Sequence, residues 1–190
     1  MKFELGGIIL ALSLGTAVTA QDMPPLSGTP DDVAYATEIW TYLEANGLAG
    51  PDRIHTAPYE GTDPHGMMLE TFYTMGAVNG YSGDLVVKNN YGPEGVSADE
   101  VLAEPAAHLA AITVMFRRED GYLAQNQNWF WAKYLPDGTL NINAVKMPLA
   151  GRVAKGMDEG CISCHANVGG DDLVFTTDHY ARKSINRAEG

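Results

Sequence analysis

The pattern of apolar and polar positions first takes a helical period between Thr29 and Gly47. Thr29 can cap a helix, and Pro30 suits the first helical turn. Four apolar residues then recur every three or four positions, which places them on one face: Val33, Ala36, Trp40 and Leu43. The sequence therefore predicts one amphipathic helix that ends before Gly47.

After Gly61 the period changes to two or to short apolar runs, which is typical of strands. We expect strands at Met67–Thr74, Leu85–Tyr91, Leu109–Arg117, Asn128–Tyr134 and Thr139–Ile142. Turn residues separate them, as at Asn79-Gly80 and Ser82-Gly83. A capping-box pattern from Ser97 to Glu100 predicts a short helix that Pro105 ends. Successive strands without long helices between them favour a mainly antiparallel sheet, so the predicted class is α+β.

The two ends of the chain differ from this pattern. Residues 1–20 combine Lys2, an apolar run and a final Val18-Thr19-Ala20, which predicts a secretory signal peptide and export to the periplasm. The alternative is a retained membrane anchor, although the run is short for a membrane-spanning helix. We expect residues 21–28 to be a flexible lead-in, 29–180 a single domain and 181–190 a polar tail.

Composition limits the classes of partner. The formal net charge is −12 at pH 7, which argues against nucleic acid and anionic membranes and leaves basic redox proteins or small molecules. The two cysteines lie close together near the C-terminus, so no disulfide framework staples the fold.

Both cysteines belong to the segment Cys161-Ile162-Ser163-Cys164-His165, a CxxCH motif. Two thiols at this spacing can add to two haem vinyl groups as thioethers, and the adjacent imidazole can bind the iron. Attachment of this kind takes place outside the cytoplasm in bacteria, in agreement with export. The motif predicts one covalently attached haem c, held by Cys161 and Cys164, with His165 as an axial iron ligand.

Three other interpretations of the cysteines stay open. A thioredoxin-like redox pair favours a βαβ context near the N-terminus. A zinc site needs further ligands at characteristic spacing. A local disulfide leaves His165 without a role, whereas the haem interpretation accounts for the whole motif.

Six segments between residues 60 and 180 together resemble one known family. They are GTDPHG at 61–66, LVVKNNY at 85–91, AITVM at 111–115, NWFWAKY at 128–134, GCISCH at 160–165 and LVFT at 173–176. The haem motif alone is not specific to a family. The ordered set is similar to the cytochrome P-460 family, whose relatives include the cytochromes c′-beta.

The resemblance implies a mainly antiparallel sheet, often assembled as a homodimer, and a five-coordinate haem with an open distal face. Cytochrome P-460 proper oxidises hydroxylamine and has a lysine linked covalently to its porphyrin; cytochrome c′-beta lacks this link and binds nitric oxide. Lys88 matches the cross-linking lysine. Because it alternates with Val87, we expect it to point to the opposite sheet face and to reach a haem there. The alternative is an exposed strand lysine.

Glu70 marks a departure from the family pattern. P-460 enzymes carry a distal arginine on the strand before the lysine, and Glu70 stands in the matching register. A carboxylate near the iron could accept a proton from a substrate N–H or O–H group, whereas one that faces water would be an ordinary strand charge. Without the arginine, hydroxylamine oxidation does not transfer directly from the resemblance.

Other side chains are candidates for the surroundings of the iron. A methionine in the sixth position would suit electron transfer; the candidates are Met67, Met68, Met75, Met115 and Met147. Apolar haem walls could come from Phe72, Phe116 and Phe130. For His65 we expect a structural hydrogen bond. We expect Trp129 and Trp131, which share a strand face, to lie in the core or in a dimer interface.

Three hypotheses for the function follow. The first is an exported monohaem c-type cytochrome with an open distal site that binds or oxidises small nitrogen species such as hydroxylamine or nitric oxide. The second is a six-coordinate His/Met electron carrier whose acidic surface docks a basic redox partner. The third is a dithiol redox protein without haem.

Overall fold

The computed structural model describes residues 27–62, 64–153, 160–167 and 172–175. The predicted signal peptide (1–20), most of the lead-in (21–28) and the polar tail (181–190) lie outside them. One antiparallel sheet runs in chain order through β1 (Tyr59–Glu60), β2 (Met68–Val78), β3 (Tyr81–Tyr91), β4 (Leu109–Arg117), β5 (Trp129–Tyr134) and β6 (Ala150–Gly151). With its few helices, this sheet confirms the predicted α+β class. No helix within the described ranges is long and apolar enough to cross a membrane.

The first helix, α1 (Pro30–Ala45), forms where its capping signals lie. The Thr29 side chain accepts from the Asp32 backbone N–H at 3.1 Å, and the Asp32 carboxylate accepts from the Thr29 N–H at 3.1 Å. This reciprocal pair satisfies two backbone donors that a helix start leaves unpaired. The fully buried side chains are Ala36, Ile39 and Leu43; Trp40 is partly buried, with its ring centroid 5.1 Å from that of Tyr134.

Strands β2 and β3 form a longer hairpin than the sequence predicts. Val78 pairs with Tyr81, and both connecting residues, Asn79 and Gly80, have positive φ, as a two-residue type I′ turn requires. Ser82-Gly83 is not a second turn, because Gly83 lies within β3. A Cβ at Gly83 would overlap the Arg117 carbonyl oxygen, so this glycine permits close approach of the next strand.

The expected strand at Thr139–Ile142 is also wrong. The segment makes only isolated bridges, from Leu140 to Tyr134 and from Ile142 to Pro148. Proline has no backbone N–H to extend a ladder, so the segment stays an irregular connection between β5 and β6.

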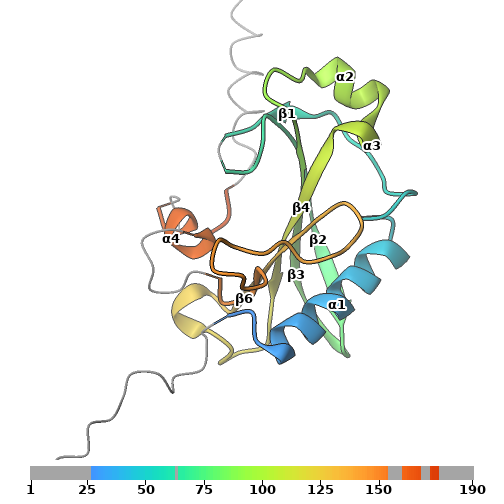
Figure 1. The fold of residues 1–190 in the computed structure, drawn as a ribbon. Coiled ribbons are helices and arrows are strands. Elements are labelled where there is room, and N and C mark those ends of the chain that lie inside the picture. The colour runs from blue at the N-terminus through green and yellow to red at the C-terminus, as the bar shows by residue number, and fades with distance from the viewer. Residues whose placement is uncertain (1–26, 63, 154–159, 168–171, 176–190) are drawn as a thin grey trace, which may run out of the picture.

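The short helix expected after Ser97 is present as α2 (Ala98–Ala103). The Ser97 side chain accepts from the Glu100 backbone N–H, and the Glu100 carboxylate accepts from the Ser97 N–H. Pro105 ends this helix and also begins a further turn, α3 (Pro105–His108), because proline suits a first helical position. Both helices lie at the end of the sheet near β1 (Figure 1).

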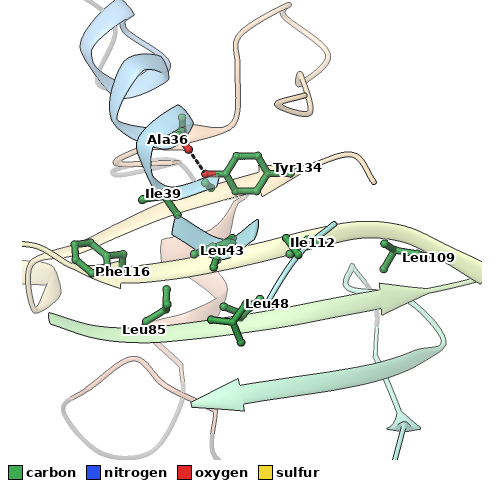
Figure 2. Close-up of a cluster of buried hydrophobic side chains, with 14 of the residues drawn as sticks. Ala36, Ile39, Leu43, Leu48, Leu85, Leu109, Ile112, Phe116 and Tyr134 are labelled. Atoms are coloured by element: carbon green, nitrogen blue, oxygen red, sulfur yellow. Dashed lines mark hydrogen bonds between the residues drawn. The ribbon is translucent and has the colours of Figure 1, made fainter. Parts of the chain in front are cut away.

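The two faces of the sheet are covered by different elements. α1 packs on one face over Leu85, Ile112 and Phe116, and the Tyr134 hydroxyl donates to the Ala36 carbonyl at 2.7 Å (Figure 2). The last helix, α4 (Cys161–His165), lies on the opposite side (Figure 1). A second buried cluster there joins Ile162 of α4 to Val86, Met115 and Trp131 of the strands.

Candidate functional site

The three motif residues are gathered by α4. Cys161 and Cys164 stand one helical turn apart, so their thiols lie on one side of the helix. Cys161 is half-buried, Cys164 is exposed, and both thiols are free. The helix follows Gly160, whose φ of 132° lies where side chains are rarely accommodated. α4 thus presents both thiols together next to His165.

His165 is held in one orientation by the chain that follows it. Its side chain is buried, and its Nδ1 lies 2.7 Å from the Leu173 carbonyl oxygen. A carbonyl only accepts, so Nδ1 carries the proton and Nε2 keeps its lone pair. Burial lowers the pKa of His165, which favours the neutral imidazole that binds metals. The ring contacts Trp131 and Phe175, with centroids 4.7 Å and 4.9 Å away.

A row of polar side chains crosses the sheet face on which α4 packs. Thr71, Lys88, Thr113 and Lys133 are successive cross-strand partners on β2 to β5. Lys88 is half-buried, and burial lowers its pKa while interaction with the Cys164 thiol opposes this shift. Burial raises the pKa of Cys161, and the Lys133 ammonium opposes that. Each lysine therefore interacts electrostatically with one of the two cysteines.

His65 also reaches this site, from the turn before β2. Its ring centroid lies 6.1 Å from that of His165, with the ring planes at 81°. The hydrogen bond expected for it is long: Nδ1 is 3.4 Å from the Thr113 hydroxyl. Burial lowers the pKa of His65 to about 3, interaction with Lys88 and with His165 adds to the shift, and a hydrogen bond with the Asn90 side chain opposes it. His65 is thus a neutral imidazole beside the predicted iron ligand.

Glu70 lies on the other sheet face, because it pairs with Asn89 while Thr71 pairs with Lys88. It therefore points away from His165. It does not face water either, because only 1% of its surface is exposed. Its carboxylate accepts hydrogen bonds from the Tyr91 hydroxyl, from the Asn89 amide at 3.1 Å and from a backbone N–H. The structure therefore gives Glu70 a role in the core and no contact with the candidate haem site.

The phenylalanines expected to wall a haem also lie away from His165. Phe72, Phe116 and Phe130 belong to the core beneath α1. Each alternates along its strand with residues that face α4, so its side chain points to the opposite side of the sheet. Trp131 is buried in the second cluster, as expected of a core residue, and it also contacts the His165 ring. The sequence already placed three side chains on one strand face by their alternation: Trp129, Trp131 and Lys133. Lys133 was nevertheless not among the predicted site residues.

The five candidate methionines are scattered. Met67 and Met75 are largely exposed, Met147 is half-buried in the irregular connection, and Met68 is buried on the α1 side. Met115 is buried on the same face as His165, packed between its cross-strand partners Val86 and Trp131. It is the one candidate with both burial and the right face.

The donor set fits a c-type haem. Two free thiols on one side of a helix precede a buried imidazole that keeps Nε2 for a metal. The buried Trp131 Nε1 has no hydrogen-bond partner among the described residues, as expected of a donor reserved for a bound polar group. By contrast, the described part of the chain contains no group of three or more His, Cys, Asp or Glu that could hold a metal ion alone.

Comparison with known proteins tests the resemblance independently. The chain matches the family model described as Cytochrome P460 over residues 73–176, which is more than half of its 190 residues. The matched span runs from β2 through Lys88 and the CxxCH segment. No curated protein and no solved structure matches the chain. The family match confirms the resemblance: the chain belongs to the cytochrome P460 family, a family of haem cytochromes.

Proposed function

We propose that this chain is an exported, periplasmic cytochrome with one covalently attached haem c, on whose distal face small nitrogen species such as hydroxylamine or nitric oxide bind or react. The observation that carries the proposal is the geometry of His165. Its Nδ1–H is bonded to the Leu173 carbonyl, which leaves Nε2 to bind iron. Cys161 and Cys164 would hold the porphyrin as thioethers.

The bound haem would supply one-electron redox chemistry and an axial position for a small ligand. The residues of this chain would orient the haem and shield its surroundings from water. The hydrogen bond to the Leu173 carbonyl fixes the imidazole and raises its basicity toward a metal. The rings of Trp131 and Phe175 exclude water from the sides of the imidazole.

We also propose that Lys88 contacts the haem edge. It shares the sheet face of α4 and lies close enough to Cys164 for their charges to interact. A covalent bond from Nζ to a porphyrin carbon would replace one N–H and one C–H. Such a bond forms by a two-electron oxidation, with an oxidant such as hydrogen peroxide reduced to two waters. The proposal thus has two forms: in the weaker one Lys88 only contacts the haem edge, and in the stronger one it is bonded to it.

The proposal extends to partners. The family resemblance implies a homodimer, and the formal charge of −12 favours a basic redox protein as electron acceptor. Light scattering on the purified holoprotein distinguishes a dimer from a monomer. An electron-transfer rate to a basic cytochrome that falls steeply with salt would support docking by charge.

The decisive experiment expresses the full chain in a periplasm that contains the c-type maturation machinery. We expect one haem per chain that stays attached in denaturant, and loss of that haem in the variant Cys161→Ser/Cys164→Ser. Ser163→Ala, in the same short helix, is the matched control and should retain haem. Absence of attached haem from the wild-type chain would overturn the proposal.

A second measurement addresses the nitrogen chemistry. Nitric oxide and hydroxylamine are added separately to the holoprotein, and the optical spectrum is followed. We expect nitric oxide to form a stable adduct with the ferrous protein, and hydroxylamine to reduce the ferric protein if the chain turns it over. A holoprotein whose spectrum neither compound changes would exclude the nitrogen species and leave electron transfer.

A further inference from the structure

Two histidines from distant parts of the chain lie close together in the candidate site, with their ring planes nearly perpendicular. The His65 and His165 ring centroids lie 6.1 Å apart. Metal–imidazole bonds are about 2 Å long, so two imidazoles that bind one metal ion from opposite sides have centroids about 6 Å apart. The observed spacing therefore matches the width of one shared ion.

The hydrogen bonds around Thr113 are compatible with a His65 tautomer that leaves Nε2 unprotonated. The Thr113 hydroxyl donates toward the Lys88 carbonyl at 3.5 Å and accepts from the Asn90 amide at 3.3 Å. With the hydroxyl donating to Lys88, the Nδ1–H tautomer of His65 is the one that can donate to its remaining lone pair. Nε2 then keeps its lone pair, as it does in His165.

The backbone around His65 is tightly placed. The His65 N–H donates to the Thr62 carbonyl at 3.0 Å, and the Met67 N–H donates to the Tyr91 carbonyl at 3.0 Å. Between them Gly66 has a φ of 130°, and a Cβ there would lie only 2.8 Å from the Tyr91 carbonyl oxygen. This turn thus carries His65 on a fixed support at the edge of the sheet.

The electrostatic surroundings also suit a ligand. Burial lowers the pKa of His65, interaction with Lys88, His165 and Lys133 adds to the shift, and a hydrogen bond with the Asn90 side chain opposes it. His65 is half-buried beside these groups, and the hydrogen bond at its Nδ1 to the Thr113 hydroxyl is long.

We propose that His65 is the second axial ligand of the haem iron in the resting protein, opposite His165, and that a small ligand must displace it. This inference rests on the haem attachment proposed above and adds a means of control. While His65 is bound, only the minor, dissociated form accepts nitric oxide, so the apparent affinity falls in proportion to that fraction.

The test compares wild-type holoprotein with His65→Ala, by optical and electron paramagnetic resonance spectra of the ferric state. Wild type is expected to be low-spin without a methionine charge-transfer band, and His65→Ala high-spin. Added imidazole should restore the low-spin spectrum of the variant. His108→Ala, which removes a histidine bonded to the Gly92 carbonyl, is the control and should stay low-spin.

Ligand binding gives a second readout. If less than a tenth of the wild-type sites are free of His65, carbon monoxide should bind ferrous His65→Ala at least about tenfold more tightly than wild type. Haem content and far-UV circular dichroism establish that the variant is folded and loaded. A high-spin wild type, or a low-spin His65→Ala, would overturn the inference while leaving haem attachment intact. A chain without attached haem would overturn both.

Discussion

Lys88 occupies the middle of the polar row that crosses the α4 face of the sheet. Its neighbours in the row, Thr71 and Thr113, are uncharged, and the next cation, Lys133, lies two strands away. Burial of the Lys88 stem lowers the pKa of its ammonium. A lysine in this position shares a sheet face with the helix that carries the cysteines and interacts electrostatically with Cys164.

We expect the ferrous Soret band of the wild-type holoprotein to be shifted to the red, because a cross-linked macrocycle has altered electronic levels. Lys88→Ala should return the band to the position typical of haem c. Lys133→Ala serves as the matched control on the same row and should retain the shift. Optical spectra, with the mass of the haem peptide, make the measurement. A wild type with an ordinary Soret band would contradict the cross-link.

Glu70 shows how a buried carboxylate can be structural. It joins β2 to β3 through Asn89 and Tyr91, and to the preceding loop through the Thr56 backbone N–H at 2.9 Å. Burial raises the pKa of Tyr91, with the Glu70 hydrogen bond and charge adding to the shift, so the phenol stays protonated and donates. The network ties the loop before β1 to the centre of the sheet.

Replacement Glu70→Ala leaves the Tyr91 hydroxyl and the Asn89 amide without their acceptor. Each unsatisfied buried group costs about 1–3 kcal/mol, and we expect the free energy of unfolding to fall by about 2–3 kcal/mol. The haem spectrum should not change, because the residue faces away from His165. Urea unfolding and the optical spectrum measure the two effects, with exposed Glu38→Ala as control. A changed spin state in Glu70→Ala would return this residue to the haem site.

At the scale of the element, the secondary structure depends on short-range signals. α1 begins at its capping box, and the β2–β3 hairpin turns at a dipeptide in which both residues have positive φ. These signals act within four residues of sequence, so they do not depend on tertiary contacts.

Removal of the cap tests this local control. Thr29→Ala deletes the side-chain acceptor for the Asp32 N–H, and a lost N-cap costs about 1 kcal/mol in the free energy of unfolding. Thr41→Ala on the exposed side of the same helix is the control; alanine favours helix, so it should be neutral or slightly stabilising. Urea unfolding curves give both values. Equal effects of the two variants would show that the capping box contributes nothing.

Local signals also explain which features of the fold and the site could be predicted from the sequence and which could not. The helix, the antiparallel sheet and the CxxCH segment follow from spacing within a few residues. The side that Glu70 and Phe72 face depends on the pairing of β2 with β3, and a shift of one residue reverses every side chain. The approach of His65 to His165 depends on contacts between residues a hundred positions apart. Neither relation is encoded in local periodicity.

At the scale of the whole molecule, the sheet separates two tasks. One face packs α1 into the larger core, which includes fully buried Ile39, Leu85 and Phe130. The other face carries α4, His65 and the polar row that contains Lys88 and Lys133. The larger core contains neither motif cysteine, nor His165, His65 or Lys88, so stability and the proposed haem chemistry have separate sets of side chains.

This separation predicts a folded protein without haem. Cys161→Ser/Cys164→Ser should keep a far-UV spectrum rich in β-sheet and unfold cooperatively on heating, because the core beneath α1 is unchanged. Leu43→Ala, which truncates a fully buried side chain of that core, should cost about 2–5 kcal/mol with or without haem. A double cysteine variant with the spectrum of an unfolded chain would show that haem is needed for the sheet to form.

The order of the strands has a consequence for assembly. Each strand pairs with the one before it in the chain, so the growing polypeptide can add strands one at a time with short loop closures. All six precede Cys161, and the wall for the cofactor can therefore be complete before the attachment machinery receives its two thiols. Maturation then becomes the last step of biogenesis, and a delay in cofactor supply leaves a waiting, compact intermediate rather than an aggregating chain.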